Sequence, residues 1–513
     1  MPRLPMLGAV AALVVSFTMI GLPAPARAGV YTWTDIAQSA VPQAECGAGS
    51  LPETGLQGDV PAADRASGRS TEGYRCNISF VGGLQQQGGG ILSPTYDHCS
   101  YTGTFFPGNL LDGAAPGVHV LDVSNPADPV HTATLNEPAM LGGTWETLKV
   151  NTARKLLAAT AVPITTGTAY FSIYDISDCA HPVLLNPGPG TDLTMPLPFL
   201  SHEGGFSPDG NTYWASSTSP GLLTAIDVSD PANPRVIWHG LQSLTAHGFG
   251  ISPDGNTMYF SIQNGINILD ISAIQRRDPY PVVPQIATYH WADGYFNQQS
   301  VPVTYDGRPY IFTGDEAGSG GVKLIDVADP ANARKVATIK LEINMPAHLG
   351  EHAQSATGNG IFSYDAHYCV ADRPADPTAL ACSWIASGIR VFDVRDPGDI
   401  REIAYYNPPA QTGRQGQLLN SVHADTAVIG APVWNYVPLA REFVNGKLDP
   451  ATMFGPRSGM IFGGDISSDW CLSPPMFHGD QIWTTCTDNG FMVLRLDNGV
   501  YTPPADQEST VGS

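Results

Sequence analysis

The sequence predicts an all-β fold, a seven-bladed β-propeller built from four-stranded antiparallel blades. Three observations predict it. A short apolar phrase ending in Asp recurs along the chain, tight-turn motifs separate the copies, and Gly and Pro are abundant, at 55 and 44 of 513 residues. Only 14% of the residues are charged, and many short strands joined by turns suit this composition better than helices do. A repeat fold also explains a single long domain, because each repeat buries its apolar face against its neighbours.

The recurring phrase is typified by residues 223–234, LTAIDVSDPANP. Its apolar residues favour a strand that is covered on both faces, and its Asp and Pro residues favour the turn that follows. The copies are 43 to 67 residues apart, which suits one blade of four strands with its loops. The motif aspartates are Asp122, Asp175, Asp227, Asp270, Asp326 and Asp393, and a degenerate seventh copy carries Arg495 instead.

A second element precedes most copies. Residues 205–214 and 250–259 each read as a strand, a Pro-Asp-Gly turn and another strand. A blade therefore consists of two strands joined by this turn, the recurring phrase as the third strand, and an outer fourth strand. Residues 74–83 also read as a strand, and we expect them to close the ring as the outer strand of the last blade, since closure removes exposed sheet edges.

These phrases resemble the LVIVD-repeat family of secreted bacterial β-propellers. The resemblance covers roughly residues 74–496. It implies the propeller fold and a location outside the cytoplasm, and it implies no particular activity, because the members of that family are mostly uncharacterised.

The N-terminus predicts export. Arg3 precedes an apolar run over residues 7–22, and small residues at 26–28 mark a cleavage point. The predicted organisation is a signal peptide (1–28), an N-terminal extension (29–73), the propeller (74–497) with an insertion near 431–460, and a flexible tail (498–513). We expect a secreted or extracytoplasmic bacterial protein with no membrane span after signal cleavage.

The eight cysteines predict disulfides, because an even number in an exported chain is typical of a disulfide framework. Local pairing is expected for Cys369 with Cys382 and for Cys471 with Cys486. The remaining four, Cys46, Cys76, Cys99 and Cys179, allow three pairings, among which the sequence does not choose.

The net charge narrows the classes of partner. Asp and Glu number 47 against 25 Lys and Arg, a net charge of −22. An acidic chain of this kind is not expected to bind nucleic acid, which attracts basic surfaces. The expected partners are a small molecule or an extracellular protein or glycan.

Aligning the blades on their turns brings His and acidic residues to one mouth of the central channel. His202 and His247 share one position, with Trp145 and Gln299 as counterparts. The next position holds acidic residues in three blades, and further His and acidic residues are expected after the second strands of blades five and six. These residues are Glu146, Glu203 and Glu351, then His352 directly after Glu351, and Glu316, Asp365 and His367 after the second strands.

This pattern predicts a divalent metal site. Imidazole nitrogen and carboxylate oxygen suit zinc, copper or iron, whereas calcium would need an oxygen-only set. The expected roles form a single set: His202, His247, His352 and His367 as metal ligands, Glu203 or Glu351 as general base, and Glu146, Glu316, Asp365 and Trp145 as ligand-binding residues.

Three functions fit this pattern. The first is a metal-binding or small-ligand-binding propeller that acts as a metal-dependent enzyme. The second is a non-catalytic extracellular module that binds protein or glycan, in which the His and Glu side chains serve packing and ordered water. The third is a metal-free hydrolase or lactonase. Metal content distinguishes the first from the other two.

Overall fold

The computed structural model describes residues 36–105, 117–141, 143–161, 170–186, 201–218, 220–348, 350–351, 363–414, 418, 420–424 and 466–505. The predicted signal peptide, the predicted insertion near 431–460, His352 and the end of the tail lie outside these residues. Residues 37–513 belong to one unit, and the description below concerns that unit.

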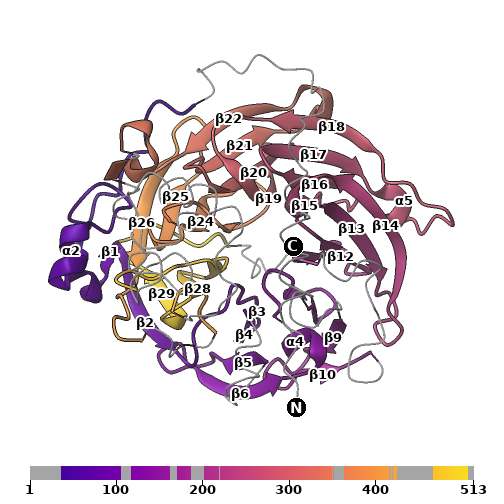
Figure 1. Ribbon diagram of the computed structural model, residues 1–513, viewed down its shortest axis with the longest axis horizontal. Coiled ribbons are helices and arrows are strands. Elements are labelled where there is room, and N and C mark those ends of the chain that lie inside the picture. Colours follow the sequence, from indigo (N-terminus) through magenta and orange to yellow (C-terminus); the bar gives the residue numbers. More distant parts are fainter. Residues whose placement is uncertain are drawn as a thin grey trace, which may run out of the picture. The chain divides into compact units, whose positions relative to one another are not determined.

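Seven antiparallel sheets surround a central axis, which confirms the predicted seven-bladed β-propeller (Figure 1). Within a blade the strands follow one another from the inside of the ring to the outside. Figure 1 shows this order in β15 and β19, which lie on the inner side, and in β18 and β22, which lie on the outer side.

The elements have the following bounds, from the innermost to the outermost strand. Blades one to three are β3 (Thr95–Tyr96), β4 (Cys99–Thr102), β5 (Val118–Asp122) and β6 (Val130–Leu135); β7 (Lys149–Asn151), β8 (Leu156–Thr160), β9 (Phe171–Asp175) and β10 (Val183–Leu184); and β11 (Glu203–Phe206), β12 (Thr212–Ser216), β13 (Gly221–Asp227) and β14 (Arg235–Ser243). Blades four and five are β15 (Ala246–Ile251), β16 (Thr257–Ile262), β17 (Gly265–Asp270) and β18 (Gln285–His290); and β19 (Tyr295–Tyr305), β20 (Arg308–Ala317), β21 (Val322–Asp326) and β22 (Arg334–Ile339). Blades six and seven are β23 (Cys369–Ala371), β24 (Ala379–Ser383), β25 (Ile389–Asp393), β26 (Arg401–Asn407) and β1 (Tyr74–Cys76); and β27 (Met476–His478), β28 (Gln481–Cys486), β29 (Gly490–Leu496) and β2 (Ile78–Leu84). The short helices are α2 (Ala62–Ser67), η2 (Arg69–Glu72), α4 (Pro138–Leu141), α5 (Ser272–Gln275), η3 (Pro330–Asn332), η4 (Glu342–Asn344) and η5 (Pro346–His348).

The segment expected to close the ring serves two blades. β2 pairs with β29 as the outer strand of blade seven, so the N-terminal and C-terminal parts of the propeller share one sheet, as predicted. β1, just before it, pairs with β26 and adds a fifth strand to blade six. The junction of the two ends is therefore held by hydrogen bonds in two neighbouring sheets.

The motif aspartates stabilise the turn after each third strand. In every one of the six copies, a side-chain oxygen of the Asp accepts a hydrogen bond from the backbone N–H two residues further along. The pairs are Asp122 with Ser124, Asp175 with Ser177, Asp227 with Ser229, Asp270 with Ser272, Asp326 with Ala328 and Asp393 with Arg395, at 2.7 to 3.2 Å. The repeated Asp is therefore an Asx-turn residue, a structural feature of the fold.

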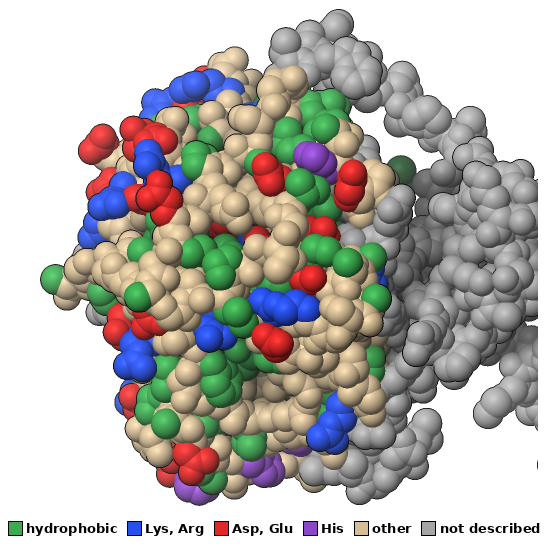
Figure 2. Space-filling model, turned by 90° about the vertical axis from the view of Figure 1, so that its left-hand side faces the viewer, with side chains coloured by type: hydrophobic (Ala, Val, Ile, Leu, Met, Phe, Trp, Pro, Cys, Tyr) green, Lys and Arg blue, Asp and Glu red, His purple; other side chains and the backbone are tan. Residues whose placement is uncertain are grey.

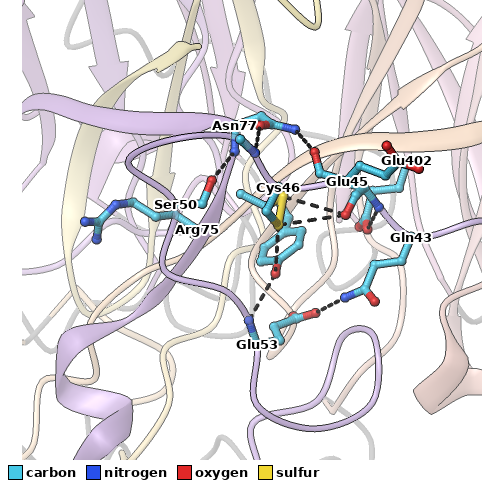
Figure 3. Close-up of a disulfide and its surroundings, with 12 residues drawn as sticks. Gln43, Glu45, Cys46, Ser50, Glu53, Arg75, Asn77 and Glu402 are labelled. Carbon is cyan, nitrogen blue, oxygen red and sulfur yellow. Dashed lines mark hydrogen bonds between the residues drawn. A yellow bond between two sulfur atoms is a disulfide. The ribbon is translucent and has the colours of Figure 1, made fainter. Parts of the chain in front are cut away.

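The N-terminal extension packs against blade six. Cys46 forms a disulfide with Cys76 of β1, and Asn77 donates to the backbone oxygen of Glu45 at 2.9 Å (Figure 3). The backbone N–H of Glu53 donates to the hydroxyl of Tyr405 at 3.0 Å. The last contact joins residues 352 positions apart, so the extension is part of the folded ring.

Arg390 of β25 is the charged centre of this contact. Its side chain is fully buried between Glu53 of the extension and Glu402 of β26, with 3.1 Å between Nη1 and the Glu402 carboxylate. The guanidinium also lies over the ring of Tyr405, 4.7 Å from its centroid. One buried cation therefore faces two buried carboxylates from different parts of the chain.

The structure pairs all eight cysteines. The two predicted local disulfides, Cys369–Cys382 and Cys471–Cys486, are confirmed. The other four cysteines form Cys46–Cys76 and Cys99–Cys179, a choice that the sequence left open. Four disulfides are typical of an extracytoplasmic protein.

Two further features concern the surface and the tail. Among the described residues, no helix has the length and apolar character needed to cross a membrane. Acidic and basic side chains are interspersed on the side of the molecule shown in Figure 2.

The start of the predicted flexible tail is packed, since Tyr501 contacts the ring of Phe477 with 5.4 Å between ring centroids and its hydroxyl donates to Asp372.

We expect Arg390→Met to destabilise the protein by about 3–5 kcal/mol, because it leaves the carboxylates of Glu53 and Glu402 buried without their cation. Arg395→Met is the matched control in the same blade. Arg395 is exposed and pairs with Asp393, so its loss should cost at most about 1 kcal/mol. Urea denaturation of both variants checks this, and equal costs would contradict the structural role given to Arg390.

Candidate metal centre

The predicted convergence of His and Glu residues is present at the inner side of the ring. His202 directly precedes β11, His247 lies in β15, and His367 lies two residues before β23. Glu146 precedes β7, and a parallel bridge joins it to Glu203 at the start of β11. Glu316 lies near the end of β20. Five blades thus each contribute at least one side chain or backbone segment to one cluster.

The imidazole nitrogens of this cluster face one another and two carboxylates. His202 Nε2 lies 3.1 Å from His247 Nε2 and 3.1 Å from Glu146 Oε2. His247 Nε2 lies 3.3 Å from Glu316 Oε2. His367 Nε2 lies 3.3 Å from Glu146 Oε1 and 3.4 Å from Glu316 Oε1. We call these five residues, His202, His247, His367, Glu146 and Glu316, the axial cluster.

These separations are those of ligand atoms around a metal ion. Bonds of about 2.1 Å to nitrogen and oxygen place neighbouring ligand atoms roughly 3.0 to 3.4 Å apart in octahedral or tetrahedral geometry. Two sets of three residues meet the looser requirement that their ligand atoms all lie within 4.8 Å of one another: Glu146, His202 and His247, and Glu146, Glu316 and His367. The spacing therefore fits a metal in both sets.

Several buried atoms of the cluster lack hydrogen-bond partners. Glu146 Oε2 and His247 Nδ1 form no hydrogen bond of ordinary geometry, although they lie 3.5 Å apart and Glu146 Oε2 also lies 3.1 Å from His202 Nε2. Gln298 in β19 donates to Glu146 Oε1 at 2.9 Å, but its own Oε1 is also without a partner. Burial of unpartnered polar atoms is unfavourable, so these atoms point to a group that the protein chain does not supply.

His367 is oriented by the backbone. Its Nδ1 lies 2.6 Å from the backbone oxygen of Leu472, which can only accept, so Nδ1 carries a hydrogen. This fixes the ring with Nε2 toward Glu146 and Glu316. Metal-binding histidines are commonly held in this way, with the second nitrogen donating to a carbonyl.

Glu203 lies beside the axial cluster in its own polar setting. Lys149 Nζ lies 2.8 Å from one of its oxygens, and the hydroxyl of Tyr368 donates to the other. Gly248 leaves the space for this carboxylate, because a Cβ at Gly248 would lie 2.9 Å from Glu203 Oε2 and 2.6 Å from the backbone oxygen of Gln298. This explains why glycine occupies the position at which other blades carry Glu.

When no ion is present, the buried imidazoles of His247 and His367 hold their protons more tightly than an ordinary histidine does. Burial alone would lower the pKa of His247, but the charges of Glu146 and Glu316 outweigh burial and raise the pKa to about 9. Burial likewise opposes protonation of His367, and hydrogen bonds to the same two carboxylates raise its pKa to about 10. A metal ion would have to displace these protons.

The carboxylates divide into two kinds. Burial would raise the pKa of Glu146, but the neighbouring His247 and His202 hold it well below its ordinary value. Glu316 behaves in the same way, and its contacts with His247 and His367 lower its pKa to about 2 despite burial. In Glu203 burial prevails over Lys149 and raises the pKa to about 7, which suits a group that exchanges protons near neutral pH.

Other predicted site residues lie outside the axial cluster. Trp145 borders it, with its ring edge toward His202 at 5.3 Å between centroids. Asp365 accepts hydrogen bonds from the Ser319 backbone at 2.7 Å and from Ser363 at 3.1 Å, so it orders a loop. Glu351 has a side chain that is 57% exposed, and it lies 3.9 Å from His348. His352 lies outside the described residues.

The sequence pattern misplaces the inner strand of blade six, and this explains why Glu351 lies outside the axial cluster. The sequence placed His367 after the second strand of that blade, whereas the innermost strand, β23, begins at Cys369. His367 is therefore the counterpart of His202 and His247 ahead of the inner strand. Blade six lacks the Pro-Asp-Gly turn of blades three and four, so its alignment had no reliable reference point.

Sequence reasoning missed Gln298, Lys149 and Tyr368. It paired Gln299 with His202, but the register of β19 against β20 shifts between Asn297 and Ser300, and Gln298 reaches Glu146 instead. Gln299 turns away to donate to the Cys369 backbone. Lys149 lies three residues after Glu146 and Tyr368 follows His367, so proximity to predicted site residues was their only signal.

No family model and no curated protein matches this chain. Similar solved structures include the periplasmic gluconolactonase PpgL of Pseudomonas aeruginosa, with 17% identity over 60% of this chain and 82% of that one and a TM-score of 0.42. Sqt1 of Chaetomium thermophilum, bound to the N-terminus of ribosomal protein L10, has 14% identity over 81% and 98% and a TM-score of 0.45. These likenesses carry no argument about the function of this chain.

The raised pKa of His247 predicts a pH dependence of stability in the metal-free protein. Protonation of His247 stabilises the fold fully below its ordinary pKa of about 6.5, and this contribution is lost as the pH rises through about 9. The difference in melting temperature between the wild type and His247→Gln should therefore shrink between about pH 6 and pH 10. Thermal unfolding in a chelator measures it, with exposed His181→Gln as control. A difference that stays constant over this range would contradict the assigned charges.

Proposed function

We propose that this propeller binds a divalent first-row transition metal at its axial cluster and uses it to act on a small molecule. The observation that carries the proposal is the set of three imidazole Nε2 atoms and two carboxylates spaced 3.1 to 3.4 Å apart on the propeller axis. Mixed imidazole and carboxylate ligands suit manganese, iron or zinc, whereas calcium would require oxygen ligands alone.

The approach to the cluster lies on the side of His202. The side chain of His202 is 17% exposed, whereas those of Glu146, His247 and His367 are nearly fully buried. Trp145 flanks His202 on this side and stacks on Phe105, with 5.4 Å between ring centroids. A small molecule would therefore reach the centre past an imidazole and an indole, which favours a ligand with a polar group and an apolar body.

Glu203 is the residue best placed to move a proton. A bound divalent ion supplies Lewis acidity, which polarises an oxygen of a ligand or of water. Glu203 has a pKa of about 7 and is held by Lys149 and Tyr368 at the edge of the cluster. As a carboxylate, Glu203 can accept a proton. Protonation weakens its ion pair with Lys149, and this favours release of the proton.

Metal content tests the proposal. The mature chain, purified without an affinity tag and passed through gel filtration, should retain about one or more equivalents of a divalent ion by elemental analysis. His202→Ala should weaken metal binding at least about 100-fold. The substitution removes a direct ligand, so the loss of affinity should exceed the loss expected for a residue that only supports a ligand. His181→Ala, an exposed histidine paired with Asp178, should retain the wild-type content.

The contrary outcome is well defined. A wild-type chain that holds less than about a tenth of an equivalent after incubation with manganese, iron, zinc and copper salts would overturn the proposal. A metal-free binding module for extracellular protein or glycan, or a metal-free hydrolase, would then be the function to pursue. Membership of the LVIVD-repeat family is compatible with either outcome and stays a prediction.

A further inference from the structure

We propose that the axial cluster holds two metal ions, bridged by Glu146. This inference rests on the proposed function and goes beyond it by assigning a second metal position. It starts from the way two carboxylates are shared: in Glu146 and in Glu316, one oxygen faces His202 or His247 and the other faces His367.

The first position has a nearly complete ligand set. His202 Nε2 and His247 Nε2 lie 3.1 Å apart, Glu146 Oε2 lies 3.1 Å from the former, and Glu316 Oε2 lies 3.3 Å from the latter. His202, His247 and Glu146 each offer one ligand atom within 4.8 Å of the others, whereas Glu316 lies outside this set and approaches His247 alone. Two imidazole nitrogens and one carboxylate oxygen suit a divalent first-row ion that keeps a further position open. The partial exposure of His202 leaves this position accessible to a further ligand.

The second position is formed by the opposite oxygens. His367 Nε2 lies 3.3 Å from Glu146 Oε1 and 3.4 Å from Glu316 Oε1. His367 is fixed by its hydrogen bond to the Leu472 carbonyl, so its Nε2 faces these two oxygens and not the first position. Bridging by the Glu146 carboxylate suits two ions about 3.5–4 Å apart, the separation found in two-metal sites.

An orphaned amide marks the second position independently. Gln298 is fully buried, its Nε2 lies 2.9 Å from Glu146 Oε1, and its Oε1 has no hydrogen-bond partner. Half a turn of this amide would bring the carbonyl oxygen to the side of the second position. An amide oxygen is a ligand for hard divalent ions, so the residue would complete an oxygen-rich site.

The two positions differ in donor type. The first has two imidazoles and one carboxylate oxygen, and the second has one imidazole and oxygen donors. Manganese, iron and zinc accept both sets, whereas copper favours nitrogen-rich or sulfur ligands. We therefore infer a pair of such ions, which would bind the two ends of an oxygen-containing group in the small molecule.

Manganese titration tests the inference. The full mature chain is stripped with a chelator and titrated with Mn²⁺, and the bound ion is counted after gel filtration and examined by electron paramagnetic resonance. The wild type should bind about two equivalents, and its spectrum should show exchange-coupled ions in place of the six-line signal of isolated Mn²⁺. His367→Ala should bind about one equivalent and show the isolated six-line signal.

Two controls keep the outcomes separable. His181→Ala should retain both ions, and circular dichroism should show that His367→Ala keeps the strand content of the wild type. Gln298→Leu provides a milder test of the second position, since it should lower the affinity for one ion only, by about 10-fold or more. One equivalent in the wild type, with an isolated signal at saturation, would overturn the two-ion centre and leave the proposed metal site intact. No bound Mn²⁺ in the wild type would overturn the two-ion centre, and if iron, zinc and copper also fail to bind, the proposed metal site is overturned as well.

Discussion

The structure depends on the positive charge that surrounds one buried carboxylate. Glu146 lies on the propeller axis, contacts His202, His247 and His367 through its two oxygens, and accepts a hydrogen bond from Gln298. A carboxylate in such surroundings is costly unless positive charge surrounds it. The imidazolium groups of His247 and His367 provide that charge when no ion is present. Convergence of the groups that surround Glu146 constrains the inner ends of at least four blades.

The same compensation connects the fold with the chemistry. Protons on His247 and His367 satisfy the acidic residues when no ion is present, and a divalent cation would replace those protons with a stronger positive charge. A cluster that is stable in both states needs rigid support. The propeller provides it, since four of the five ligands lie on or just before an inner strand and Glu316 lies on the second strand of blade five, and each of these strands is hydrogen-bonded into its blade. The buried Arg390 group secures the extension to the same ring at a distance from this chemistry.

The sequence predicted the fold because local chemistry repeats. Six of the seven third strands combine an apolar run with an Asp that accepts from the turn, and this combination identifies blades without any long-range information. The axial cluster was predictable to the extent that the repeat fixes register: His202, His247, Glu146 and Glu203 occupy matched positions in well-aligned blades. The two local disulfides were predictable because their partners lie only 13 and 15 residues apart in the sequence.

The remaining residues depend on features that a single sequence does not encode locally. A register shift in β19 brings Gln298 to the axis in place of Gln299. Blade six lacks the turn motif, so the sequence placed Glu351 at the start of the inner strand of this blade. In the structure His367 precedes that strand, and Glu351 is exposed. The pairing of Cys99 with Cys179 joins blades one and two across a long separation, and only the packed ring determines it.

The central claim is that His202, His247 and Glu146 surround a metal ion, and anomalous X-ray diffraction at the absorption edge of the bound element tests it most directly. The account predicts an anomalous peak about 2.1 Å from both Nε2 atoms and from an oxygen of Glu146. Crystals of metal-treated protein that show no peak there, with His202 and His247 bonded directly to the carboxylates, would contradict it.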